Sequence, residues 1–145
     1  MTTTPDPALP LVEFAFPGPL RDRLVAAIAS GAKTSTSSLL VQYAADEEEL
    51  PVVGSRGTVI DSDGRPVLVV ETTDVAIARL ADVPLTHAVD EGEGFTTVAE
   101  WRAGHEAFWT SAEFVAGLPD GFALDDGTEV VLERFRVVGR AGTGA

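Results

Sequence analysis

The chain has 145 residues, 45% of them hydrophobic and 23% charged, and its formal net charge is −13. This length predicts one domain with one core, and the absence of cysteine excludes disulfides, thiolate metal sites and cysteine nucleophiles. Because Asp and Glu outnumber Lys and Arg by 23 to 10, the overall charge disfavours long RNA and favours a small substrate or a local basic pocket.

We expect neither a secretory signal at the N-terminus nor a membrane-spanning segment. No apolar run approaches the roughly 20 residues needed to cross a bilayer. The N-terminus is rich in Thr and Pro and lacks the basic start of a secretory signal. We therefore expect a cytoplasmic protein, with a disordered lead over residues 1–10, a single domain over 11–138 and a flexible tail over 139–145.

The first predicted element is a helix over residues 20–29, which Gly31 ends as a left-handed cap. One lysine and five hydroxyl residues follow between Lys33 and Ser38, and we interpret them as a polar loop. Lys33 is the only lysine in the chain, so it is either an ordinary loop residue or an amine retained for its chemistry. A lysine can act as a general base if its pKa is lowered, and a neighbouring threonine could be the nucleophile. Periodicity leaves residues 38–45 open between a short helix and an extended segment.

The pattern changes to β after Pro51. An Asp-Gly turn over residues 62–65 predicts a hairpin, and Thr97 with Glu100 forms a capping-box pattern that predicts a helix to about Thr110. Residues 111–116 could add a further helical turn, and Asp125 to Thr128 reads as a second tight turn. The expected strands cover residues 57–61, 66–73, 74–80 and 129–138. This order of elements predicts an α+β fold, a small β-barrel flanked by helices.

Two further segments carry polar or aromatic side chains of interest. The acidic loop over residues 90–94 could serve as a general acid or base or bind a ribose, but carboxylates ahead of a helix also favour its dipole. Trp101, His105, Phe108 and Trp109 share one helical face, which is typical of core packing. A base-stacking platform would need some of these rings exposed. The two histidines, His87 and His105, show no recognised metal-ligand spacing, so we predict no metal site.

Several segments together resemble the ASCH domains of the PUA-like superfamily. They are residues 16–24, Gly31 to Thr36 with the pattern Gly-x-Lys-x-x-Thr, Val53-Gly54 with the hairpin that follows, Glu91 to Gly94, Trp101-Arg102 and residues 105–109. They span nearly the whole chain in the expected order. The resemblance implies a β-barrel flanked by helices, with a cleft at its mouth that is lined by the Gly-x-Lys-x-x-Thr loop.

The resemblance also implies RNA or a modified nucleoside as partner, and the lack of a long apolar run predicts no membrane partner. One branch of the family looks like amidohydrolases that deacylate N4-acetylcytidine with a lysine, a threonine and a glutamate. These correspond here to Lys33, Thr36 and Glu93, with Glu91 as a competitor for Glu93. In this hypothesis Lys33 deprotonates Thr36 and Glu93 protonates the leaving amine. Residues expected to bind the substrate are Arg21, Arg23, Thr34, Glu91, Trp101 and Arg102.

Two other functions remain open at this point. A second family branch is described as a metal-dependent ribonuclease, and only that branch would need a divalent ion; otherwise we expect no cofactor. The rival to both hydrolases is a non-catalytic RNA- or nucleotide-binding regulatory module, in which Lys33, Arg21, Arg23 and Arg102 hold a phosphate while an aromatic ring stacks on a base.

Overall fold

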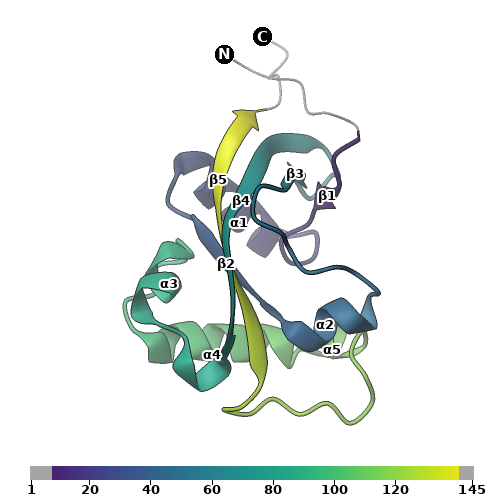
Figure 1. The fold of residues 1–145 in the computed structure, drawn as a ribbon, viewed down its shortest axis with the longest axis vertical. Helices are drawn as coiled ribbons and strands as arrows, with labels where there is room; N and C mark the ends of the chain where they lie inside the picture. Colours follow the sequence, from purple (N-terminus) through teal and green to yellow (C-terminus); the bar gives the residue numbers. More distant parts are fainter. Residues whose placement is uncertain (1–7, 141–145) are drawn as a thin grey trace.

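The computed structural model describes residues 8–140 as a five-stranded sheet with helices around it (Figure 1). The strand order is β1-β3-β4-β5-β2. Only β1 and β3 pair in parallel, and the other neighbours in the described sheet are antiparallel. The strands are β1 (Leu11–Val12), β2 (Ser35–Leu39), β3 (Arg56–Ile60), β4 (Pro66–Arg79) and β5 (Glu129–Arg140).

This α+β architecture agrees with the sequence, but the sheet is open. Within residues 8–140 the edge strands β1 and β2 pair with one neighbour each and not with one another, so the expected barrel does not close. The helices are α1 (Pro19–Ser30), α2 (Leu40–Ala45), α3 (Leu85–Asp90), α4 (Val98–Trp109) and α5 (Ala112–Val115), with a 3-10 turn at Leu80–Asp82. Figure 1 shows α1 toward one end of the long β4–β5 ribbon and α4 and α5 toward the other.

The two longest helices begin and end where their capping residues predict. Pro19 occupies the first turn of α1, and Gly31 ends that helix in the left-handed conformation with φ 88°. Thr97 and Glu100 form the predicted capping box at the start of α4, each side chain accepting a backbone N–H. Residues 111–116 do continue as a helical turn, α5.

The predicted hairpin is present as β3 and β4, but β4 is longer than expected. Residues 66–73 and 74–80 were predicted as two strands, and they form one strand to Arg79. A shift in the pairing with β5 between Thr72 and Asp74 lets β4 continue through the irregular position. The closing strand, predicted to end at 138, extends to Arg140.

The hydroxyl-rich segment was predicted as a loop and is largely the edge strand β2. Its backbone pairs with β5, and the undecided residues that follow complete this strand and then form α2. Short elements with little periodicity, β1 and α3, were not predicted. The expected lead over residues 1–10 and tail over 139–145 lie mostly outside the described residues. Gly139 and Arg140, however, belong to β5.

Two clusters of buried apolar side chains form the core. One joins α1 to the sheet and contains Phe14, Val25, Ile28, Val59, Leu68, Val70 and Phe135. The other packs α4 and α5 on the opposite end of the ribbon and contains Leu39, Leu80, Val83, Ala88, Trp101, Trp109, Phe114, Val130 and Leu132. Among residues 8–140 no helix is both long and apolar enough to span a bilayer.

Candidate functional site

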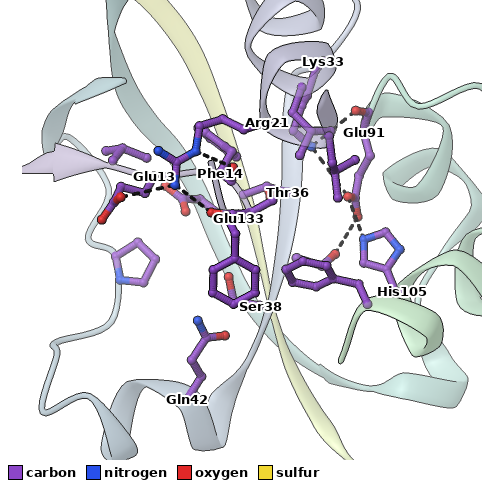
Figure 2. Close-up of a pocket in the computed structure, with 18 of the residues that line it drawn as sticks. Glu13, Phe14, Arg21, Lys33, Thr36, Ser38, Gln42, Glu91, His105 and Glu133 are labelled. Atoms are coloured by element: carbon purple, nitrogen blue, oxygen red, sulfur yellow. Dashed lines mark hydrogen bonds and ion pairs between the residues drawn. The ribbon is translucent and has the colours of Figure 1, made fainter. Parts of the chain in front are cut away.

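A cleft with a volume of about 1360 Å³ opens between these two ends of the ribbon. Its walls come from the segment before α1, from β2 and α2, from the acidic loop after α3, and from α4. Figure 2 shows Lys33, Glu91 and His105 on one side, Arg21 and Glu13 on the other, and Thr36 with Glu133 between them. This volume is ample for a ligand the size of a nucleoside.

Lys33 is buried on the wall of this cleft, with only 2% of its surface exposed. The left-handed turn at Gly31 reverses the chain, so that the Lys33 N–H donates to Ala27 O at 3.0 Å and the side chain points away from solvent. Its Nζ donates to Ser35 O at 2.8 Å and to Glu91 O at 3.3 Å. Burial lowers the pKa of Lys33, and the Glu91 and Glu93 carboxylates oppose that change.

Glu91 is the most heavily contacted carboxylate of the site, and 1% of its surface is exposed. Its Oε2 accepts from Trp101 Nε1 at 2.6 Å and from Ser37 Oγ at 2.7 Å. His105 Nε2 lies 3.1 Å from Oε1 and His87 Nε2 3.3 Å from Oε2, and Lys33 Nζ is 3.6 Å from Oε1. Burial would raise the pKa of Glu91, but the hydrogen bonds from His105 and His87 and the Lys33 charge hold it far below its usual range.

Gly92 brings the acidic loop against the segment that carries Lys33. A Cβ at Gly92 would lie 2.7 Å from the Ala32 carbonyl, and the backbone φ of 71° is in the left-handed region. The adjacent Thr34 N–H donates to Asp90 O at 2.8 Å, which fastens the same two segments. A glycine is therefore required for this close approach.

Glu93 is half-buried at the mouth of the same cluster. Burial raises the pKa of its carboxyl, while the charges of Lys33 and His105 lower it, and the net shift is upward. Glu91 and Glu93, the two competitors in the sequence, therefore occupy different environments. Glu91 is the ion-pair partner of Lys33, and Glu93 is the carboxyl that retains a proton to higher pH.

The only potential metal-ligand group among residues 8–140 consists of Glu91, Glu93 and His105, whose ligand atoms lie within 4.8 Å of one another. These residue types suit a divalent cation. Both Glu91 oxygens are already engaged by hydrogen-bond donors, and the Lys33 ammonium adds a positive charge beside them. A cation would have to displace these donors, so the arrangement does not fit a metal well.

Histidines 87 and 105 are functional candidates that the sequence did not predict. His87 lies four residues before Glu91, on α3, and His105 reaches the same carboxylate from α4. Burial lowers the pKa of His105, but the Glu91 hydrogen bond and charge outweigh it and raise the pKa overall. His87 and Glu91 stand four residues apart in the sequence, whereas His105 joins the cluster through tertiary packing.

Thr36 lies on β2 directly opposite Glu133 of β5 in the strand register, and both line the cleft. The Thr36 hydroxyl has no hydrogen-bond partner among the described residues, and Lys33 Nζ bonds to carbonyls rather than to it. Glu133 Oε2 accepts from Thr72 Oγ1 at 2.7 Å, and burial raises the pKa of this carboxyl. Glu133 was not predicted as a site residue.

The remaining predicted binding residues occupy different environments. Arg21 is buried and donates to the Phe14, Ala15 and Asp61 carbonyls, so it holds the chain segment before α1 in place. Arg23 is exposed at the cleft. Arg102 pairs with Glu106 and Asp126 and does not line the cleft.

Trp101 is fully buried and stacks on His105, with ring centroids 4.5 Å apart. The indole therefore has no free face for a base, and its N–H is committed to Glu91. Thr34 contributes backbone groups, because its carbonyl also accepts from the Phe135 N–H at 3.1 Å.

Comparison with known proteins places these features in a family context. The model of the ASCH domain matches residues 13–139. A crystal structure of a protein from Enterococcus faecalis V583 is 28% identical with a TM-score of 0.77, covering 89% of this chain and 76% of that one. The ASCH domain from Lactobacillus crispatus JV V101 is 27% identical with a TM-score of 0.75, covering 88% and 77%. No curated protein matches the sequence.

Proposed function

The chain belongs to the ASCH domain family, and we propose that it hydrolyses small acylated nucleosides of the N4-acylcytidine class in the cleft beside Lys33. One observation carries the proposal. Thr36, whose hydroxyl has no partner in the described structure, lines the same cleft as a cluster of buried titratable groups, and acyl transfer to a hydroxyl uses groups of both kinds.

The proposed role of each group follows from its charge and from the hydrogen-bonding capacity that it has left. Thr36 supplies the nucleophilic hydroxyl. Glu93 protonates the leaving amine, since burial raises the pKa of its carboxyl above the ordinary glutamate value. Lys33 fixes the acidic loop through its bonds to Ser35 O and Glu91 O, and its charge stabilises negative charge that develops in the cleft.

The charges around the cleft favour a neutral substrate over a polynucleotide. Lys33 is paired with Glu91, Arg21 is engaged by backbone carbonyls and Arg56 is paired with Glu71. Of the lysine and arginine side chains that line the cleft, Arg23 is therefore the one without such a partner in the described part of the chain. A phosphate backbone needs several cations, so RNA binding by this face would be weak.

The test is hydrolysis of N4-acetylcytidine by the wild type and by Thr36→Val, which removes the hydroxyl at nearly constant volume. Thr73→Val is the matched control, because Thr73 is also a half-buried strand threonine but does not line the cleft. We expect turnover by the wild type and the control and none by Thr36→Val.

A labelled RNA, incubated with and without Mg²⁺, separates the rival functions. Mg²⁺-dependent cleavage of RNA without nucleoside turnover would replace the proposal with a ribonuclease. Salt-dependent binding of intact RNA, again without turnover, would replace it with a regulatory binding module.

A further inference from the structure

We propose that Glu133 is the general base that takes the proton from Thr36. The substrate class rests on the function proposed above, but the pairing of this carboxylate with this hydroxyl is a separate claim and is tested separately. Neither the family resemblance nor the family match assigns a role to this position.

The geometry of the sheet brings the two side chains together. Thr36 of β2 and Glu133 of β5 are direct partners in an antiparallel pair, so their side chains project from the same face of the sheet. Cβ atoms of such partners lie about 4.5–5.5 Å apart. Figure 2 shows both residues between the two walls of the cleft.

Both groups have unused hydrogen-bonding capacity. Thr72 Oγ1 donates to Glu133 Oε2 and so orients the carboxylate, while Oε1 has no partner among residues 8–140. The Thr36 hydroxyl is likewise unpartnered there. A carboxylate anchored through one oxygen and open at the other can accept a proton from a neighbouring hydroxyl, directly or through one water molecule.

The other titratable groups of the cleft are less suited to this role. Lys33 Nζ already donates to two carbonyls, and Glu91 accepts from four side chains, so neither can take a proton without losing contacts. Glu93 interacts with Lys33, His105 and Glu91. Burial raises the pKa of Glu133, which strengthens it as a base. Tyr43 of α2 is a titratable neighbour, and burial together with the Glu133 charge raises the pKa of its hydroxyl.

The chemistry balances with two carboxyl groups. In the first step Thr36 Oγ bonds to the acyl carbon, its proton passes to Glu133, the C–N bond breaks, and the amine leaves with the proton of Glu93. In the second step water attacks the acyl-Thr36 ester. Its hydroxyl joins the acyl group, its proton returns to Glu93, and the Glu133 proton returns to Thr36 as the carboxylic acid departs.

The experiment uses p-nitrophenyl acetate, whose nitrophenolate leaves without needing an acid, as a probe of the hydroxyl itself. Peptide mass spectrometry measures the rate at which Thr36 becomes acetylated. We expect Glu133→Gln to slow it roughly 100-fold or more, since positioned bases contribute about 10²–10⁴-fold. Glu113→Gln, at an exposed glutamate of the same cleft, is the matched control and should not change the rate.

Two features of the design separate chemistry from folding. In Glu133→Gln the new amide carbonyl can still accept from Thr72, and thermal unfolding of the variant checks that the fold persists. Glu133→Asp retains a carboxylate and should recover part of the rate, which a purely structural role would not predict.

The outcomes distinguish this proposal from the function that it extends. Equal acetylation of Thr36 in the wild type and Glu133→Gln, or no acetylation in either, would overturn the base assignment. Glu133-dependent acetylation without hydrolysis of N4-acetylcytidine would support the base and reject the substrate class. If Glu133→Gln hydrolysed the nucleoside as fast as the wild type, the substrate class would be supported and the base assignment rejected.

Discussion

Two regions of the cleft differ in how many of their polar groups have hydrogen-bond partners. One is the wall around Lys33 and Glu91, and the other is the floor between the walls, formed by Thr36 and Glu133. Beside Lys33, the Glu91 carboxylate accepts from Trp101 and Ser37 and lies against two histidines, so nearly every donor and acceptor has a partner. On the floor, Thr36 has no partner in the described structure and Glu133 uses one oxygen. A buried polar group that is fully paired mainly determines structure, whereas one with spare capacity is available to a ligand. The first region therefore maintains the shape of the cleft, and the second has groups free to contact a ligand.

The largest loss of stability should come from substituting Glu91, the carboxylate at the centre of the fully paired wall. Glu91→Gln removes the charge that faces Lys33, His87 and His105, and leaving a buried charge unpaired costs roughly 3–5 kcal/mol. Urea unfolding measures the loss. Glu49→Gln, at an exposed position, should stay within about 0.5 kcal/mol of the wild type. A Glu91→Gln variant as stable as the control would remove the contrast between the two regions.

A smaller loss is expected at Arg21, which belongs to the structural side of the comparison although it lines the cleft. Arg21→Met leaves the Phe14 and Ala15 carbonyls without their donor, at a cost of about 2–3 kcal/mol in the free energy of unfolding. The exposed Arg23→Met is the matched control, with a change of about 0.5 kcal/mol or less. If Arg21→Met lost as little stability as Arg23→Met, Arg21 would not be needed for the fold and would instead be assigned to ligand binding.

The pH dependence of stability should report on His105, with an effect below that of Arg21. Glu91 raises the pKa of His105 in the folded state, so its contribution is present below the ordinary histidine pKa of about 6.5 and is lost as pH rises through the folded value. Glu91 stays ionised throughout this range and adds no slope. Unfolding free energies measured above about pH 6.5 should fall in the wild type and change less in His105→Gln. Identical slopes would contradict the pairing.

The smallest effect on stability is expected on the floor of the cleft. Thr36→Val removes a hydroxyl that bonds to nothing in the described structure, so unfolding free energy should change by about 0.5 kcal/mol or less. Thr72→Val, which removes the donor to Glu133, should cost about 1 kcal/mol by the same urea measurement. A Thr36→Val loss as large as that of Arg21→Met would show that the hydroxyl has a structural partner after all.

Features encoded by neighbouring residues were predictable from the sequence. Gly31 and the Thr97–Glu100 pair mark the ends of the two long helices because capping depends on residues within one turn. The strand β2 was missed because serines and threonines favour loops locally, and only pairing with β5 makes this segment extended. The conformational propensity of the β2 segment does not depend on a strand that lies so far away in the sequence.

The candidate site, like the fold, was predictable only where its residues are close together in the sequence. Lys33, Thr36 and the acidic loop were found through a local pattern that resembles a family. His105 and Glu133 were missed because each reaches the cleft only through tertiary packing, from α4 and β5. Glu133 does stand in the alternating half of the closing strand, and its charge on the face that also carries Phe135 is a local signal for a site residue.

The position of β5 between β4 and β2 also bears on how the chain folds. Thr72 and Glu133, which meet on the floor of the cleft, are 61 positions apart in sequence, and β2 has no strand partner other than β5 in the described sheet. Contacts of such long sequence separation slow folding, because a large loop must close before they form. While the ribosome is still synthesising β5, β2 remains an unpaired edge that a chaperone could shield. Because Thr36 lies on β2 and Glu133 on β5, the cleft can be complete only after β5 has been synthesised and has paired.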